Sequence, residues 1–398
     1  MIKSYSKICC LTLAIAGFGF IPTSLIAQER IWVPAAIEGK PVRLIFDTAA
    51  SRSVLYRRTV ERLGLKSIDP NSTNRANPQI TYNLLEPFNF SLWGNSFRTR
   101  FYEVNFPNSL SPDGDGLLGW GMVRDNLFWI DMEFNFMSPL REIPEICEHW
   151  PKFQIPRDAE ILALSYSNDG RTNSIVLDTG SLAGVALAPK KWEQWMKDNR
   201  GSPTTLRATV SLGEGLTVGE EVWAKTLEIG PLSLKNVPIC KASADQLSFA
   251  PGFEALVGAQ ALKQMILAVD GEKDVAYVGI KQRPPQPYNH NRLGAVFIPK
   301  DLQSTNLIAH VASKSPAEKS GVKNGDILLK INNLDVALWQ SNPEIRNSLR
   351  DSFASPAGTK LRLELQRGTD VTNIVVTLRD IIGPRSTVNA KVISLETQ

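Results

Sequence analysis

Asp178 stands where an apolar run meets a turn, a position from which a carboxyl group could do chemistry. Residues 174–177 are mostly β-branched or aliphatic, which favours a buried strand. Thr179, Gly180 and Ser181 follow directly, and a glycine at a strand end permits a tight turn and the close approach of another backbone. The pattern predicts an acid held on a rigid strand.

Asp47 repeats this arrangement earlier in the chain. Residues 42–46 form another strand-like run, and Thr48, Ala49 and Ala50 follow the acid. A single copy would indicate an ordinary turn after a strand. Two matched copies favour a site shared between them.

Two carboxyl groups that meet at an interface have a defined chemistry. Carboxylates about 3 Å apart cannot both be ionised, so they share one proton and titrate as a pair. The ionised member can take a proton from water while the protonated member polarises a carbonyl oxygen. If the two halves pack about a pseudo-twofold axis, Asp47 and Asp178 predict general acid-base hydrolysis without a metal or a covalent intermediate.

Further landmarks recur in the same order in both halves. Leu117-Leu118-Gly119 is followed 12 residues later by Asp131, and Leu256-Val257-Gly258 is followed 12 residues later by Asp270. Matched landmarks in one order indicate an internal duplication.

Composition excludes several classes of protein. The chain has 398 residues, of which 43% are hydrophobic and 21% charged, so it can bury substantial cores. Its 44 basic and 40 acidic residues give a net charge of +4 without a long basic tract, which argues against nucleic acid. Residues 113–116 lack the spaced ligands of a calcium loop, and the three histidines are scattered, so we expect no metal and no cofactor.

The N-terminus has the pattern of a secretory signal peptide. Lys3 and Lys7 precede an apolar run over 8–21, and small residues lead to Ala27. We expect an exported protein, periplasmic or extracellular, with an uncleaved membrane tether as the alternative. Cys147 and Cys240 would remain after cleavage, and the sequence leaves open whether they form a disulfide.

With its Asp-Thr-Gly motif and the downstream aliphatic-aliphatic-glycine elements, the chain resembles the aspartic peptidases of the pepsin and retropepsin clan. The resemblance covers residues 31–281. It implies a mainly β fold class, with two retropepsin-like acid protease β-barrel lobes in one chain, and it implies that Asp47 and Asp178 are the catalytic pair. Two acid-bearing lobes in one chain make a monomeric site possible.

The same resemblance assigns roles to neighbouring residues. Thr48 and Thr179 would hydrogen-bond across the interface, and hairpins at 211–216 and, less clearly, near 80–82 would close over substrate. Ala49 departs from the motif, because the family has glycine at that position. An added methyl group where two backbones approach predicts a cost in stability or a displaced carboxylate, and puts activity in doubt.

The turns after the two acids also differ in hydrogen-bonding capacity. Ser181 follows Gly180 and could donate to Asp178, whereas the equivalent position in the first half is Ala50. Because donation to a carboxylate favours its charged form, we expect Asp178 to be ionised and Asp47 to carry the proton.

Residues 293–380 resemble a PDZ domain of the type attached to exported bacterial proteases. The resemblance rests on residues 315–332, where Ser315 and Glu318 form a capping box and Gly321 ends the helix. Such domains bind an extended peptide end as an added strand. The resemblance implies a loop from Arg292 whose exposed amides receive a terminal carboxylate, with the binding residues Leu293, Gly294, Ala295 and Val296.

The sequence therefore predicts an aspartic endopeptidase that hydrolyses protein or peptide substrates, with a PDZ domain that positions them. The alternative is an inactive peptide-binding protein that retains both folds. The expected divisions are a signal peptide (1–27), a first lobe (28–140), a linker (141–160), a second lobe (161–281), a linker (282–291), a PDZ domain (292–380) and a tail (381–398).

Overall fold

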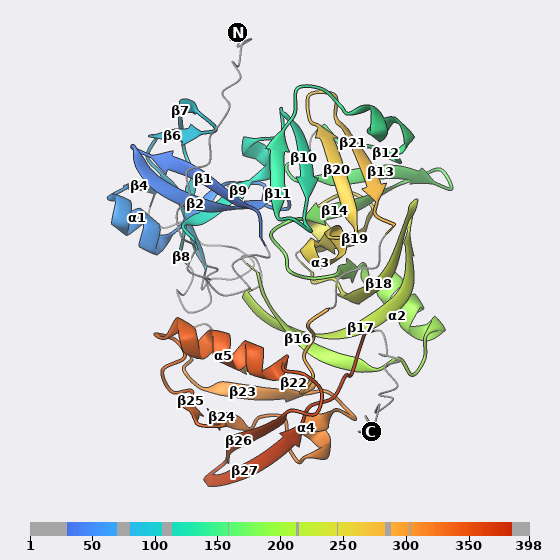
Figure 1. The fold of residues 1–398 in the computed structure, drawn as a ribbon. Helices are drawn as coiled ribbons and strands as arrows, with labels where there is room; N and C mark the ends of the chain where they lie inside the picture. The colour runs from blue at the N-terminus through green and yellow to red at the C-terminus, as the bar shows by residue number, and fades with distance from the viewer. Residues whose placement is uncertain are drawn as a thin grey trace, which may run out of the picture.

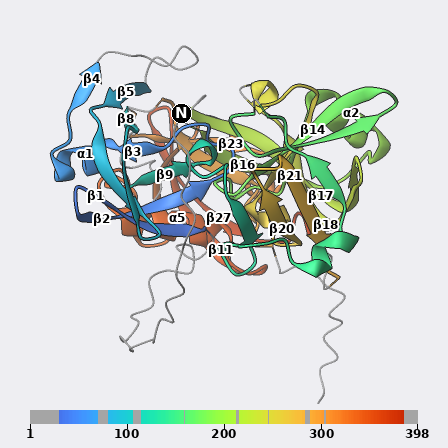
Figure 2. The same cartoon turned by 90° about the horizontal axis from the view of Figure 1, so that it is seen from above.

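The computed structural model describes residues 30–69, 80–105, 114–157, 159–211, 215–244, 246–282, 288–301 and 304–383. The predicted signal peptide and nearly all of the predicted tail lie outside these residues. The fold is mainly β, as expected. Two lobes lie side by side, and a third domain lies beneath the long strands of the second lobe (Figures 1 and 2).

The first lobe is a nine-stranded sheet in the order β4-β5-β8-β3-β9-β2-β1-β6-β7. β2 (Lys40–Asp47) pairs in parallel with β9 (Gly116–Gly119), and β3 (Val54–Tyr56) pairs antiparallel with the other side of β9. The other strands are β1 (Trp32–Ile37), β4 (Ser67–Asp69), β5 (Thr81–Leu85), β6 (Phe88–Leu92), β7 (Asn95–Thr99) and β8 (Tyr102–Asn105).

The second lobe repeats these pairings within a twelve-stranded sheet. β14 (Arg171–Asp178) pairs in parallel with β19 (Phe253–Gly258), and β15 (Val185–Leu187) pairs antiparallel with β19. The other strands are β10 (Leu127–Asp131), β11 (Phe136–Pro139), β12 (Lys152–Gln154), β13 (Ala163–Asn168), β16 (Thr204–Ser211), β17 (Gly215–Ile229), β18 (Leu232–Lys241), β20 (Met265–Asp270) and β21 (Val275–Ile280).

Short helices occupy matching places in the two lobes. α1 (Arg57–Leu63) ends at Gly64, which adopts a left-handed backbone, and α2 (Pro189–Asp198) begins at its proline. After the glycines that end β9 and β19 come η1 (Trp120–Met122) and α3 (Ala259–Leu262), and η2 (Glu145–His149) and η3 (Gln246–Ser248) lie in connections.

β10 joins the two lobes, because it pairs antiparallel with β20. Trp129 lies opposite Ala268, Leu127 opposite Asp270, and Ile130 opposite Leu267. The landmarks Asp131 and Asp270 make Trp129 and Ala268 equivalent positions, so a pseudo-twofold axis passes through that pair.

This joint places strands from the predicted first lobe and the predicted linker in the sheet of the second lobe. β10 and β11 lie in the twelve-stranded sheet, although the predicted first lobe ran to residue 140. The predicted linker at 141–160 contains η2 and β12, and β12 pairs with β21 and β13. A composition rich in proline indicated a connector, but it could not show that part of the segment completes a sheet.

The C-terminal domain is a six-stranded sheet with two helices. Its main path is β22-β23-β24-β26-β27, and β25 pairs with β24. Ser315 caps α4 (Pro316–Lys319) by accepting from the Glu318 N–H, which confirms the capping box, and Asn342 caps α5 (Pro343–Phe353). The strands are β22 (Ala295–Pro299), β23 (Leu307–Val311), β24 (Ile327–Ile331), β25 (Leu334–Asp335), β26 (Lys360–Arg367) and β27 (Asp370–Thr377).

Apolar burial follows this division. One continuous core of buried side chains runs through both lobes, and a separate core fills the C-terminal domain. The two lobes therefore act as one folding unit. Among the helices that the structure describes, none is long and apolar enough to cross a bilayer.

Candidate active site

The strand ends bring Asp47 and Asp178 to equivalent positions. Asp47 is opposite Gly119 at the end of β2, and Asp178 is opposite Gly258 at the end of β14. An ideal Cβ on Gly119 would lie 2.7 Å from Ala50 O, and one on Gly258 would lie 2.6 Å from Ala183 O. The downstream glycines are thus required because each acid-bearing loop folds back over them.

Thr48 and Thr179 tie the two loops together by reciprocal hydrogen bonds. The Thr48 N–H donates to Thr179 Oγ1 at 3.1 Å, and the Thr179 N–H donates to Thr48 Oγ1 at 3.1 Å. Each hydroxyl also donates across the interface, Thr48 to Leu177 O (2.6 Å) and Thr179 to Phe46 O (2.7 Å). Both threonines are fully buried, so these bonds fix the loops face to face.

Gly180 lies directly against the opposite acid. An ideal Cβ on this residue would be 2.4 Å from Asp47 Oδ2. Ala49 occupies the equivalent turn position and keeps the turn intact, since its N–H donates to Asp47 Oδ1 at 3.0 Å. Its methyl group packs against an apolar cluster of the second lobe that includes Ile161 and Ala250. The methyl group is accommodated by the neighbouring lobe.

Burial and mutual proximity perturb the two acids. Desolvation raises the pKa of Asp47, because loss of water disfavours a charged carboxylate. For Asp178, desolvation and the field of Asp47 raise the pKa to about 8, against the lowering effect of the Ser181 and Gly180 amides and of Arg30. The pair therefore holds one proton at neutral pH.

The hydrogen bonds that reach Asp178 differ from those expected. Ser181 Oγ accepts from the Ala183 N–H at 3.3 Å, and no hydrogen bond joins this hydroxyl to Asp178. The backbone N–H groups of Ser181 and Gly180 donate to Asp178 Oδ1 at 2.8 and 3.0 Å. They do not outweigh burial and the neighbouring carboxylate, which together raise the pKa of Asp178 and favour its protonated form.

Arg30 is a site residue that sequence reasoning missed. Its Nη1 donates to Gly180 O at 3.0 Å, and its charge lowers the pKa of both Asp47 and Asp178. It precedes β1 and has no motif around it. The only available signal was its position three residues after Ala27, the expected cleavage point.

The two arms of the hairpin expected at 211–216 are formed, because β16 pairs with β17 from Thr204 opposite Val222 to Ser211 opposite Gly215. Residues 212–214, between these arms, lie outside those described. Leu216 of β17 packs against an apolar cluster of the first lobe that includes Ile45 and Ile80, so the hairpin reaches across to the other lobe. The weaker candidate near 80–82 lies at the start of β5, which pairs with β8. The residues between β4 and β5 lie outside those described.

The expected PDZ carboxylate loop is formed, but it is not exposed. Leu293 and Ala295 are fully buried, Val296 and Gly294 are buried, and an ideal Cβ on Gly294 would be 2.4 Å from the Ser315 side chain. The Leu293 and Gly294 N–H groups donate to Asn291 Oδ1 at 3.0 and 3.2 Å. The expectation of free amides is therefore wrong, because a side chain two residues upstream already satisfies two of them.

Cys147 and Cys240 are both free thiols. Burial raises the pKa of the Cys240 thiol to about 11 and also raises that of Cys147, so both are poor nucleophiles at neutral pH. Within the described residues, no group of three histidine, cysteine, aspartate or glutamate side chains is placed to hold a metal ion.

Comparison with known families agrees with this geometry in the first lobe and in the C-terminal domain. Residues 33–120 match the aspartyl protease family model, which spans β1 to β9 and includes Asp47. Residues 33–120 are an aspartyl protease domain. Residues 307–367 match the PDZ domain model. No curated protein matches the chain at the threshold applied. The lobe that matches the aspartyl protease model is thus the one that carries Asp47-Thr48-Ala49 in place of Asp-Thr-Gly.

Proposed function

We propose that this protein is an aspartic endopeptidase whose catalytic pair is Asp47 and Asp178. The reciprocal bonds between Thr48 and Thr179 carry the proposal, because they hold two strand-end acids together across a pseudo-twofold axis. Asp178 is buried and Asp47 is partly buried. An aspartyl protease domain in the first lobe and the repeated strand order in the second support two retropepsin-like lobes in tandem.

In the proposed reaction the two carboxyl groups act in opposite senses. Ionised Asp47 takes a proton from a water molecule, whose oxygen attacks the carbonyl carbon of the scissile peptide bond. Protonated Asp178 donates to the carbonyl oxygen as negative charge develops there. Collapse of the tetrahedral adduct transfers a proton to the leaving nitrogen, and the pair regains its single proton. The raised pKa of Asp178 keeps that donor protonated at neutral pH.

The decisive experiment is cleavage of an unfolded protein by the purified chain, with Asp47→Asn and Asp178→Asn as variants. We expect each variant to lose at least about a thousandfold in kcat/KM, because the residues act as a unit. Asp198→Asn, an exposed aspartate at the end of α2, is the control and should retain full activity. Thermal unfolding of each variant would show that it is folded.

The alternative is a peptide-binding protein without catalysis, for which the departure at Ala49 is the specific observation. In that case, neither the parent chain nor its variants would cleave at any pH from acid to alkaline. Labelled peptides would still bind to the cleft.

We also propose that the protein is exported, on the basis of the apolar segment before Pro22. Fractionation of cells that express the full chain should place it outside the cytoplasm, with an N-terminus at Gln28. A cytoplasmic protein that still begins at Met1 would contradict this.

A further inference from the structure

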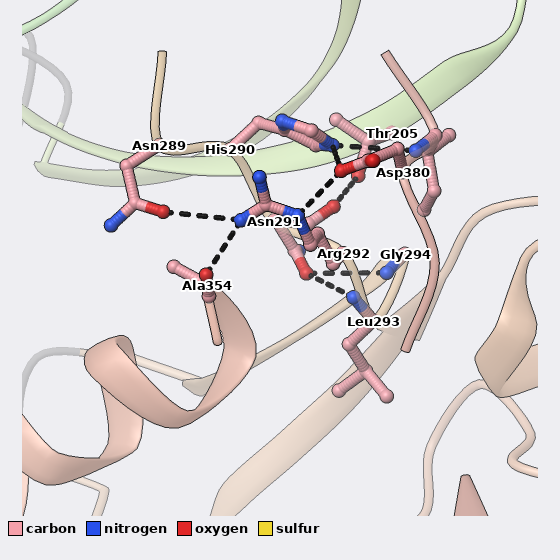
Figure 3. Close-up of polar contacts among 10 residues, drawn as sticks. Thr205, Asn289, His290, Asn291, Arg292, Leu293, Gly294, Ala354 and Asp380 are labelled. Carbon is pink, nitrogen blue, oxygen red and sulfur yellow. Dashed lines mark hydrogen bonds and ion pairs between the residues drawn. The ribbon is translucent and has the colours of Figure 1, made fainter. Parts of the chain in front are cut away.

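Asn291 connects the PDZ domain to a strand of the second lobe (Figure 3). Its Nδ2 donates to Leu206 O of β16 at 3.1 Å and to Ala295 O of β22 at 2.8 Å. The backbone carbonyl oxygen of Asn291 accepts from Thr205 Oγ1 at 2.7 Å. One residue thus links β16 and β22 through both its side chain and its backbone.

The same side chain occupies the place of a carboxylate. Asn291 Oδ1 accepts from two successive backbone N–H groups, those of Leu293 and Gly294. Successive amides that converge on one oxygen form an anion-binding concavity. These are the amides that a PDZ domain offers to a peptide terminus, so the Asn291 oxygen stands in for one carboxylate oxygen.

The strand-addition edge of the PDZ sheet is also covered. Gly294 O accepts from the Ala312 N–H of the β23 side, so the next carbonyl, Ala295 O, points to the opposite, open edge of β22. That carbonyl shares the Asn291 amide with Leu206 O. β16 therefore lies along the edge that an incoming peptide would use.

The space between β16 and β22 is too small for a further strand. Cα atoms of the two strands come within 8 Å of each other. A strand inserted between them would need about twice the 4.8 Å strand spacing. A peptide that adds to β22 must therefore push β16 away.

β16 is the first strand of the hairpin that reaches the other lobe. Its partner β17 carries Leu216, which packs against the first-lobe cluster, and Glu221, which accepts from Tyr288 Oη at 2.7 Å. Arg207 of β16 pairs with Glu221 in the same buried network, and the Tyr288 ring stacks on Trp223 of β17. The segment expected to be a linker at 282–291 is therefore docked on this hairpin where residues 288–291 are described.

We propose that the free C-terminal carboxylate of a polypeptide binds the Leu293 and Gly294 amides in place of Asn291, and that this binding releases the β16–β17 hairpin from the PDZ domain. The proposal deepens the function given above, since the released hairpin would open the cleft and raise the rate of cleavage. The ligand is a protein C-terminus, such as one left by an earlier cleavage.

The chemistry favours this exchange. A carboxylate makes hydrogen bonds roughly twice as strong as those of an amide oxygen. Arg292 lies next to the two amides, and its Nε donates to Asp380 Oδ1 at 2.7 Å, so this ion pair offsets its positive charge. A ligand shifts the equilibrium between the docked and the released hairpin only if it binds the released state more tightly. A peptide would do so, because the edge of β22 that it would use is covered in the docked state.

Hydrogen exchange of the full chain tests the proposal without relying on catalysis. The probe is a pool of ten-residue peptides that end in Val, Leu, Ile, Phe or Ala with a free carboxylate, and the control is the same pool with amidated ends. We expect the free-carboxylate pool to speed amide exchange in residues 204–211 and 215–222 by at least about fivefold, the lower end of typical coupling. Unchanged exchange at saturation, or equal binding of the amidated pool, would overturn the proposal.

Two substitutions at Asn291 separate the bonds that its side chain accepts from the PDZ amides from the bond that it donates to Leu206 of β16. Asn291→Ala removes both, so hairpin exchange should rise without peptide, and peptide affinity should increase about fivefold because no internal acceptor competes. Asn291→Asp keeps an acceptor on the amides but loses the donor to Leu206. Its hairpin exchange should also rise, while its peptide affinity should fall at least about tenfold because the acceptor is now charged. Equal peptide affinities in the two variants would contradict the role of Asn291.

Thr205→Val removes only the bond from β16 to the Asn291 backbone. It should raise hairpin exchange and, because the docked hairpin opposes the peptide, it should also raise peptide affinity. Thr204→Val is its matched control, since Thr204 Oγ1 bonds only within its own segment, to Ser202 O at 3.4 Å. If the chain cleaves proteins, the peptide pool and Asn291→Ala should each raise kcat/KM. If it cleaves nothing, exchange and affinity still decide this proposal, and the failure is that of the proposed function alone.

Discussion

The two acid-bearing loops share one geometry but differ in what surrounds the acid. In the second lobe, Gly180 leaves room for the Asp47 carboxylate, and two N–H groups reach Asp178. In the first lobe, Ala49 replaces the glycine and its methyl group packs into the second lobe. The lobes are therefore not interchangeable. Glycine is required where the opposite carboxylate approaches, and alanine is tolerated where the neighbour is an apolar cluster.

Gly180→Ala should break this comparison most strongly. Its new Cβ would lie 2.4 Å from Asp47 Oδ2 and would displace the acid, and misplacement of a reacting group by about 1 Å costs about a hundredfold in kcat/KM. Gly219→Ala is the control, because an ideal Cβ there meets nothing within 4 Å. A fully active Gly180→Ala protein would show that the two positions are equivalent after all.

Thr48→Val and Thr179→Val should lower the free energy of unfolding by similar amounts, about 3 kcal/mol each, because each leaves a buried N–H and a buried carbonyl unpaired. Urea denaturation measures both. Thr209→Val, at an exposed position of β16, is the control, and its free energy of unfolding should change by no more than about 0.5 kcal/mol. A large difference between Thr48→Val and Thr179→Val would show that one lobe does most of the clamping.

Asp178→Asn should stabilise the protein increasingly as pH rises from about 4 to about 8. The folded protein holds a proton on Asp178 up to about pH 8, whereas an ordinary aspartate releases it near 3.8. Over that range the parent chain therefore loses stability with rising pH, and asparagine, which is neutral throughout, does not. Denaturation at pH 5 and pH 9 measures the difference. A larger gain from Asp47→Asn at pH 9 would place the shared proton on Asp47 instead.

Ala49→Gly should have the smallest effect. Its N–H already donates to Asp47, so we expect kcat/KM to stay within about threefold of the parent value. The free energy of unfolding should fall by about 1 kcal/mol, because glycine is more flexible in the unfolded chain. A gain of more than tenfold in kcat/KM would instead mean that the methyl group displaces Asp47.

Much of the local structure was readable from short segments. The end of α1 at Gly64, the proline start of α2, the capping box at Ser315 and the hairpin between Ser211 and Gly215 all follow from residues close together in sequence. These features depend on backbone preferences and on interactions over a few residues. The pairing of Thr48 with Thr179 spans 131 residues, and it was expected only because the chain resembles a known family.

Other features had no local signal. Pairing of β10 with β20 joins segments about 140 residues apart, and the contact of Arg30 with Gly180 spans 150 residues. The raised pKa of Asp178 depends on burial and on the field of Asp47, which the argument based on the Ser181 hydroxyl did not include.

By itself, the sequence determined that two acids end two similar strands and that a PDZ domain follows them, because apolar runs, glycines and caps act over short distances. Only the tertiary structure decided that burial raises the pKa of both acids, where the lobes join, and that Asn291 covers the PDZ amides beneath β16. The physical reason is that desolvation, electrostatic fields and packing between strands depend on residues far apart in the chain, whose proximity no short segment encodes.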